Sequence, residues 1–341
     1  MDWNDFVGHE RQREWFRTAI RKNRLASTFL LIGPPQIGKR TFARLVAKSL
    51  FCRHREPGTA EICGRCESCI QVDAGTHPDL LTVEKEAGSS RVTIEQLVGS
   101  VENRLREGLA YDIRLKPYYG DRRIAILDDA DTFGPDQANC LLKTLEEPPA
   151  GSLIFLISQN EHRQLPTIRS RSQAVRFGPL SPPELQTLIL RLGWCQDPAE
   201  AASLAARSGG SLATADRIRD PAFDEFLNQF VVLLELNPLP IVKLSGLVES
   251  LVKGAGDDSH AKRELLQIAL QTASERYRPH LVQGGVHGSR RAMHPAVAAS
   301  LIAQTIDAQS LVDRNVNASS VIESWLAGLA RAIDSAAARS A

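Results

Sequence analysis

A glycine-rich segment near the N-terminus has the spacing of a phosphate-binding loop. Gly33-Pro34-Pro35-Gln36-Ile37-Gly38-Lys39-Arg40-Thr41 follows an apolar run and precedes a stretch with helical periodicity. In such a loop the glycines let successive N–H groups and the positive end of the helix face phosphate oxygens, and the lysine neutralises the terminal phosphates. The spacing predicts a site for ATP or ADP, with Gly33, Gly38 and Lys39 against the phosphates.

Arg40 departs from this pattern at the position that normally binds magnesium. That position usually carries a serine or threonine hydroxyl, and a guanidinium cation cannot coordinate a metal ion. Thr41 comes one residue later, about 100° further round the helix, and is a poor substitute. A chance glycine-rich turn is one alternative and an active nucleotide site another. The sequence favours a nucleotide-binding loop without turnover, and a role for Mg²⁺ is doubtful.

A group of carboxylates follows a second apolar run. Arg123–Leu127 precedes Asp128, Asp129 and Asp131. Beside a phosphate loop, an aspartate at the end of such a strand holds magnesium, and neighbouring groups orient water. By itself, an apolar strand followed by acids is usually only a strand end. Combined with the loop around Lys39, the pattern predicts that Asp128 lies at the metal position.

Four cysteines immediately after the expected P-loop helix have the spacing of a metal site. Cys52, Cys63, Cys66 and Cys69 form the pattern C-x10-C-x2-C-x2-C. Four thiolates suit one tetrahedral Zn²⁺ with no open position, which makes the predicted site structural. Iron–sulfur clusters also use closely spaced cysteines, but the Cys-Pro ending of ferredoxins is missing. Zinc is favoured, and an iron–sulfur cluster and unliganded thiols are the alternatives.

These residues need a scaffold, and residues 28–178 alternate short apolar runs with helical stretches, as in a parallel sheet covered by helices. Five runs are rich in β-branched residues or leucine: Thr28–Ile32, Leu80–Val83, Arg123–Leu127, Leu153–Ile157 and Ala174–Phe177. Apolar residues at three- and four-residue spacing predict the helices between them, over Arg40–Phe51, Thr93–Leu105 and Asp136–Leu145. The expected fold class of this part is α/β.

After Gly178-Pro179 only helical patterns follow. Ser181–Glu184 begins a helix, because it combines an N-cap serine, early prolines and an acidic residue three places on. Later helices are expected over Phe223–Leu236, Pro240–Lys253, Lys262–Tyr277, Pro295–Arg314 and Ser319–Ser335. The predicted domains are residues 1–178, with the cysteine module at 52–70, then residues 179–220 and residues 221–341.

The composition is that of an ordinary globular chain without a strong overall field. At 341 residues, 43% of them hydrophobic, two or three folded domains are expected. A net charge of +1 excludes global attraction to DNA or anionic membranes, so any nucleic-acid contact must be local. No segment has the pattern of a secretory signal or of a membrane span. We therefore expect a cytoplasmic protein without a membrane partner, whose cysteines bind metal rather than form disulfides.

Four segments follow one another along the chain: the P-loop, the cysteine module, Lys143-Thr144-Leu145-Glu146-Glu147-Pro148-Pro149 and the arginine segment Leu165–Ser172. In this order they resemble the clamp-loader branch of the AAA+ proteins. The resemblance covers roughly the whole chain and is strongest from Trp3 to Phe177. It implies an α/β P-loop AAA+ domain with an inserted zinc module. An α-helical lid at 179–220 and an all-α collar domain at 221–341 would follow.

The resemblance also gives a role to Arg171. In the family the arginine segment ends Ser-Arg-Cys, and its arginine reaches the gamma-phosphate of ATP bound to the neighbouring subunit. Ser170-Arg171-Ser172 matches with serine in place of cysteine, which leaves unchanged the guanidinium group that does the electrostatic work. An isolated Arg-Ser-Arg is more often a solvated basic loop, but its position in the fold favours a trans arginine finger.

Three departures favour the delta-prime type of subunit over the gamma/tau type. They are Arg40, Asp129 in place of the glutamate that orients water, and Ala213 in place of a sensor arginine. The shorter Asp129 would leave its carboxylate about an ångström from the position it needs. The implied protein is a stator in a hetero-pentamer with gamma/tau and delta subunits, which loads the sliding clamp onto primed DNA. An active gamma/tau-type ATPase is the alternative, and an unrelated regulatory or helicase-like AAA+ protein is the third.

Overall fold

The chain forms two compact units in the computed structural model. The structure describes residues 1–56, 58–86, 89, 91–104, 106–159, 161, 164–236, 238–256, 258–281, 293–314 and 316–340. The first unit contains Met1–Ala206 and Gly210–Leu212, and the second contains Arg207–Gly209 and Ala213–Ala341. The predicted division into three domains is a different partition and stays a prediction.

The first unit is built on a five-stranded parallel sheet. Its strands are β1 Thr28–Ile32, β2 Leu80–Val83, β3 Arg123–Leu127, β4 Ser152–Ser158 and β5 Gln173–Arg176. Every pairing is parallel, and the order across the sheet is β2-β3-β4-β1-β5. All five predicted strands are therefore confirmed to within a residue or so at each end. β1, β3 and β4 are almost completely buried, which explains why their sequences are continuously apolar rather than alternating.

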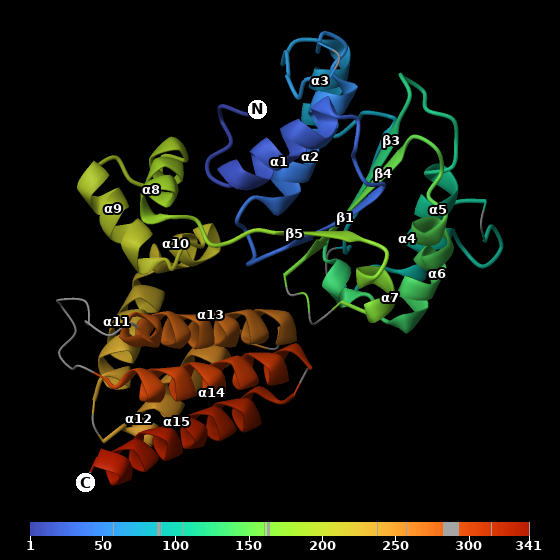
Figure 1. Ribbon diagram of the computed structural model, residues 1–341. Coiled ribbons are helices and arrows are strands. Elements are labelled where there is room, and N and C mark those ends of the chain that lie inside the picture. The colour runs from blue at the N-terminus through green and yellow to red at the C-terminus, as the bar shows by residue number, and fades with distance from the viewer. Residues whose placement is uncertain are drawn as a thin grey trace. The chain divides into compact units, whose positions relative to one another are not determined.

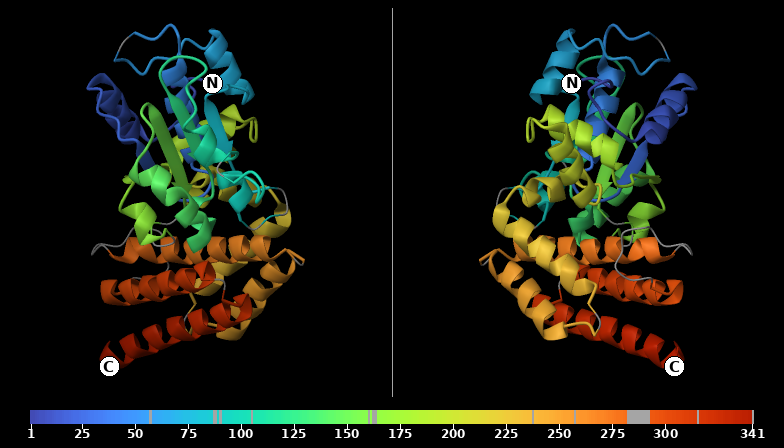
Figure 2. Two further views of the ribbon diagram at one scale, coloured as in Figure 1. Left: turned by 90° about the vertical axis from the view of Figure 1, so that its right-hand side faces the viewer. Right: turned by 90° about the vertical axis from the view of Figure 1, so that its left-hand side faces the viewer.

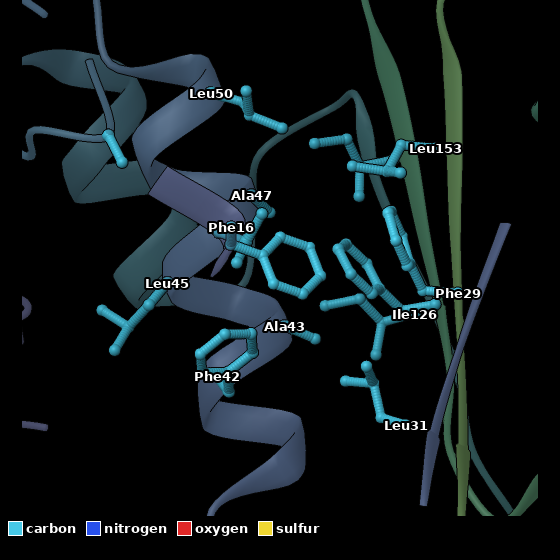
Figure 3. Close-up of a cluster of buried hydrophobic side chains, with 14 of the residues drawn as sticks. Phe16, Phe29, Leu31, Phe42, Ala43, Leu45, Ala47, Leu50, Ile126 and Leu153 are labelled. Carbon is cyan, nitrogen blue, oxygen red and sulfur yellow. The ribbon is translucent and has the colours of Figure 1, made fainter. Parts of the chain in front are cut away.

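Helices cover both faces of this sheet (Figure 1). On one side lie α1 Glu10–Arg21 and α2 Lys39–Phe51, and on the other α4 Ile94–Val98, α5 Leu109–Asp112, α6 Pro135–Glu146 and α7 Pro166–Arg169. Successive strand residues point to opposite sides, so Phe29 and Leu31 belong to the α2 side and Leu30 and Ile32 to the other. Figure 3 shows Phe16, Phe29 and Ile126 between α2 and the strands.

One predicted helix is wrong in length. The prediction covered Thr93–Leu105, but α4 begins after the capping box of Thr93 and Gln96 and ends at Val98. Gly99 then takes φ +83°, and Gly108 also takes φ +83°. A Cβ on Gly108 would lie 2.6 Å from the Gly99 nitrogen, so the backbone closes on itself here as only glycine allows. Leu105 lies outside the described residues.

The helical remainder begins where the sequence predicts. The side chain of Glu184 accepts the N–H of Ser181 at 2.7 Å, and this capping box begins α8 Pro182–Arg191. Two further helices follow, α9 Pro198–Arg207 and α10 Leu212–Ile218.

The second unit is a bundle of helices. Its five long helices are α11 Pro221–Leu234, α12 Ile241–Lys253, α13 Ser259–Tyr277, α14 Pro295–Asp313 and α15 Ala318–Ser340. α14 lies between α13 and α15 and contacts both (Figures 1 and 2). In its core the indole N–H of Trp325 donates to the Thr305 hydroxyl at 3.1 Å. Within the described part of the chain, no helix combines the length and apolar character needed to cross a membrane.

Candidate functional site

The P-loop connects β1 to α2 and has the conformation that its glycines allow. Gly38 has φ +96° at the N-cap of α2, a backbone geometry that strains residues with a Cβ. A Cβ on Gly33 would lie 2.3 Å from the carbonyl oxygen of Phe177. The chain therefore approaches the end of β5 too closely for any larger residue at this position.

Lys39 is the first residue of α2 and is almost fully buried, with 5% of its surface exposed. Its Nζ donates to the carbonyl oxygens of Gly33 at 2.6 Å and Pro34 at 2.5 Å. Burial lowers the pKa of Lys39 to about 8, and the charges of Asp131 and Asp128 oppose this shift only in part. The Lys39 ammonium group thus donates to carbonyls of its own loop. In a nucleotide complex, phosphate oxygens could replace these two carbonyls as acceptors.

Arg40 contacts carboxylates that follow two adjacent strands. Its Nη1 donates to Glu84, the residue after β2, and lies 3.6 Å from Oδ2 of Asp128, the residue after β3. The two carboxylates are neighbours because β2 pairs with β3 and the Asp128 N–H donates to the Val83 carbonyl at 2.8 Å. Burial raises the pKa of Asp128, whereas the charges of Arg40 and Lys39 lower it. A guanidinium group therefore lies against the carboxylate that was predicted to hold magnesium.

Asp129 is already engaged elsewhere. Its backbone takes φ +51°, which non-glycine residues rarely adopt, and its carboxylate lies 3.3 Å from Nζ of Lys85. Its N–H donates to Oδ1 of Asp128 at 3.0 Å. The carboxylate at the water-orienting position, which is already too short for that role, thus also has an ion-pair partner.

These residues surround a cavity of about 520 Å³. Five of the predicted residues line it, namely Gly38, Lys39, Arg40, Thr41 and Asp128. Gly33 joins the group through its carbonyl contact with Lys39. The size suits a nucleotide-sized ligand, so the structure brings the predicted phosphate and carboxylate residues into one place.

The apolar walls of this cavity were not predicted from the sequence. They come from the N-terminal segment, including Phe6 and Val7, and from α8, including Leu188 and Leu192. His9 connects this N-terminal segment to the P-loop, because its buried Nε2 lies 2.8 Å from the Ile37 carbonyl oxygen. Burial lowers the pKa of His9. Nothing in the local sequence marks these residues, because only the tertiary fold brings them beside the P-loop.

The four predicted cysteines form a separate cluster. Their sulfur atoms all lie within 4.8 Å of one another, and Cys63 and Cys69 are 4.0 Å apart. Around a tetrahedral Zn²⁺ with Zn–S bonds of about 2.3 Å, sulfurs lie about 3.8 Å apart. The set of donors and its spacing therefore fit a four-thiolate metal site.

The electrostatics around Cys63 favour a thiolate. Burial works against the charge, but the N–H groups of Arg65 and Cys66 and the side chain of His54 outweigh it and lower the pKa of Cys63 to about 5. The N–H of Cys66 donates to Cys63 Sγ, with nitrogen and sulfur 3.4 Å apart. A negatively charged sulfur is the form that binds metal. Burial raises the pKa of Cys52 and of Cys69, so these thiols would lose their protons only as metal binds.

The cysteine module is attached to the P-loop helix. Cys66 is the residue before α3 Glu67–Ala74, and this helix packs against α2. Asp73 of α3 contacts Nζ of the buried Lys48 at 2.5 Å, and Arg44 donates to the Val72 carbonyl at 2.7 Å. A metal bound to the four sulfurs would thus fix the chain after α2 and stabilise that helix through its contacts with α3.

Arg171 belongs neither to the lining of the cavity nor to the cysteine cluster. It follows the short helix α7, and its side chain is 32% exposed. Its guanidinium group contacts Oε1 of Glu146 at 2.5 Å and donates to the Thr167 carbonyl at 3.0 Å and the Ser170 hydroxyl at 3.1 Å. The arginine is therefore held by residues of its own chain yet reachable from solvent.

Comparisons with known proteins find subunits of DNA polymerase III. A family model described as "DNA polymerase III, delta subunit" matches residues 8–181. DNA polymerase III subunit delta' of Pseudomonas aeruginosa is 36% identical over 209 residues, 60% of this chain and 60% of that protein. The Bacillus subtilis protein of the same name is 31% identical over 220 residues, 64% of this chain and 61% of that protein. DNA polymerase III subunit tau/gamma of Haemophilus influenzae is 33% identical over 168 residues, 49% of this chain and 22% of that protein.

Proposed function

This chain belongs to the family of DNA polymerase III delta-prime subunits, and from this premise we propose that it is a stator of the clamp loader. In this role it has little or no ATPase activity of its own. It supplies Arg171 to the ATP site of a neighbouring subunit and so helps to load the sliding clamp onto primed DNA. The matches span about 60% of the delta' relatives' own length, and the activity of the whole protein is part of this proposal.

The observation that carries the proposal is the contact between Arg40 and Asp128. Hydrolysis in a P-loop site needs Mg²⁺ between the loop, the aspartate and the phosphates. Here the guanidinium group lies 3.6 Å from the aspartate oxygen that would bind the ion. The ion pair of Asp129 with Lys85 adds a second obstacle, because that carboxylate is not free to orient water.

Arg171 supplies the other half of the proposal. A guanidinium group that reaches a neighbour's phosphates must be exposed and must keep its charge. Arg171 meets the first condition and, as an arginine, the second. Its hydrogen bonds to Thr167 and Ser170 restrict its rotamers, which lowers the entropy lost when a neighbouring ATP is engaged.

ATP turnover tests the proposal in two settings. The isolated chain is expected to show no turnover above that of its Lys39→Ala variant. Addition of the chain to gamma/tau and delta subunits is expected to raise turnover of the assembly, in proportion to assembled complex. Robust turnover by the isolated chain that disappears in Lys39→Ala would overturn the stator proposal.

The cysteine cluster is proposed as a structural zinc site. The four sulfurs and their spacing support Zn²⁺, held by Cys52, Cys63, Cys66 and Cys69 with no open position. Bound there, zinc would supply no chemistry beyond fixing the segment after α2. Elemental analysis of the purified protein is expected to give one zinc ion per chain, and iron with visible absorption would instead indicate an iron–sulfur cluster.

The remaining assignments follow the family. We propose that residues 1–178 form the AAA+ domain, residues 179–220 a lid, and residues 221–341 a collar that joins gamma/tau and delta in a cytoplasmic hetero-pentamer. Primed DNA would be contacted through the assembled complex.

An active gamma/tau-type ATPase is the second candidate, because a tau/gamma protein is 33% identical over 168 residues. Copy number separates the two candidates. A motor subunit is expected in several copies per reconstituted complex and a stator in one, which native mass spectrometry measures directly.

A further inference from the structure

The guanidinium group of Arg40 lies where a bound metal ion would be expected. It faces the cavity of about 520 Å³, and it contacts Glu84 after β2 and Asp128 after β3. Oδ1 of Asp128 accepts the N–H of Asp129 at 3.0 Å, while Oδ2 faces Arg40. Both oxygens of this carboxylate therefore have partners within the chain.

A nucleoside polyphosphate needs cations wherever it binds. In P-loop sites the lysine and the helix N-terminus meet part of the phosphate charge, and Mg²⁺ meets the rest while it bridges to the aspartate. A guanidinium group also meets phosphate charge, through bidentate hydrogen bonds, and stays protonated at every physiological pH. Arg40 can therefore neutralise charge and connect to Asp128 as the ion does, although it cannot replace the ion's water ligands.

We propose that Arg40 takes the place of the metal ion, so that the cavity binds a nucleoside di- or triphosphate without Mg²⁺. The phosphates would accept hydrogen bonds from Arg40 and from the Lys39 ammonium group. This inference rests on the proposed assignment of the cavity as a nucleotide site.

The contacts of Arg40 allow this exchange of partners. Its side chain is 38% exposed and that of Glu84 is 51% exposed, so this ion pair is solvated and weak. A phosphate group can therefore displace Glu84, whereas the 23% exposed Asp128 remains to orient the guanidinium group. Lys39 exchanges the carbonyls of Gly33 and Pro34 in the same way.

Calorimetric titration of the full chain with ADP and with ATP tests the proposal, with either EDTA or excess Mg²⁺ in the buffer. The wild-type affinity is expected to change by less than about threefold between the two buffers. In Arg40→Thr, which restores a hydroxyl at this position, the affinity in EDTA is expected to fall about tenfold or more and to recover with Mg²⁺. Lys39→Ala locates the binding, because it should abolish it in both buffers.

A second measurement uses Mn²⁺ as a paramagnetic probe. Electron paramagnetic resonance is expected to detect no Mn²⁺ bound to the wild-type chain with ADP beyond that bound by ADP alone, and to detect bound Mn²⁺ in Arg40→Thr. Thermal melting of each variant shows that it is folded before its affinity is interpreted.

Two results would overturn the inference. One is wild-type binding that requires Mg²⁺, and the other is no binding of ADP or ATP in either buffer. Loss of binding in both buffers leaves the proposed stator role intact, since the role of Arg171 is measured as turnover of the assembled complex. Binding that requires Mg²⁺ would remove the argument from the Arg40–Asp128 contact, and turnover by the isolated chain would then decide whether the chain is a stator.

Discussion

Arg40 and Arg171 belong to the same α/β unit but have opposite surroundings. Arg40 faces the cavity of its own chain and contacts Glu84 and Asp128. Arg171 lies outside that cavity, after α7, and contacts the single carboxylate of Glu146. The same kind of side chain therefore has two different environments. One guanidinium group lies against the carboxylate at the predicted metal position, and the other is partly exposed to solvent.

The comparison shows that the number of arginines near a P-loop fold says little about activity. An arginine whose partners are the site's own carboxylates removes the binding site of the catalytic ion. An arginine outside the cavity, held by one carboxylate and by nearby backbone, can act on phosphates bound to another subunit. Substitutions at the two positions should accordingly affect different assays.

Replacement of Arg171 by alanine is expected to have the largest effect. Turnover at the one neighbouring ATP site that Arg171 completes should fall by about 10³-fold, because one guanidinium group at the transferring phosphate contributes this much or more. Clamp loading that depends on this site should fall with it. ADP binding by the isolated chain should not change, since Arg171 does not line the cavity. Arg169→Ala, at the end of α7 and two residues before Arg171, is the matched control because its partner is Glu161. Full-speed clamp loading by the Arg171→Ala complex would contradict the role proposed for this arginine.

Loss of the proposed zinc site is expected to destabilise the cysteine module and α2, the helix that contains Arg40. Cys69→Ser replaces a fully buried sulfur and should lower the free energy of unfolding by about 3 kcal/mol or more, because metal binding is coupled to folding. Zinc content and the thermal midpoint measure this change. Cys140→Ser is the control outside the cluster, and it should retain the metal. An unchanged midpoint in Cys69→Ser would rule out a structural metal at this cluster.

Glu146→Gln removes the carboxylate that contacts Arg171 and is expected to have a smaller effect than Arg171→Ala. The ion pair with Arg171 is partly exposed, at 32% and 47%, and such pairs contribute up to about 1 kcal/mol. Loss of this orientation should reduce stimulated turnover of the complex by up to about fivefold. Glu147→Gln, at the next position, is the matched control. A loss as large as that of Arg171→Ala would mean that Glu146 itself reaches the neighbouring site.

The sequence predicts the sheet well because its strands are continuous apolar runs bounded by glycine, proline or charge. Thr28–Ile32, Leu80–Val83 and Arg123–Leu127 match the structure residue for residue. The helix over Thr93–Leu105 fails because Gly99 and Gly108 close a turn that overrides the local periodicity. Local patterns thus predict elements and miss backbone contacts between distant glycines.

The site is predictable in its residues but not in their pairing. That Arg40 cannot bind magnesium follows from its chemistry. Its contact with Glu84, which is distant in sequence, depends on β2 lying beside β3 in the sheet order. The cavity walls from Phe6 and Leu188 depend in the same way on tertiary contacts. Residue types fix which groups are available, and topology decides which of them meet.

The smallest expected effect is a pH dependence that separates Lys39 from Arg40. Burial lowers the pKa of Lys39 to about 8, whereas an arginine stays charged. Between about pH 7 and about pH 8.5 the charged fraction of Lys39 should fall about fourfold, and with it the affinity for ADP in EDTA. The free protein should change in the opposite sense. From pH about 8 up to the ordinary lysine value of 10.5 the unfolded chain binds the additional proton, so stability rises with pH across this window.

Calorimetry of Lys39→Arg is the control for this dependence, because its guanidinium group does not titrate in the range and the affinity profile should become flat. A flat profile in the wild-type chain would show that Lys39 keeps its proton in the cavity. Arg40 and Lys39 would then contribute equal, permanent charges, and only the position of Arg40 against Asp128 would distinguish the two.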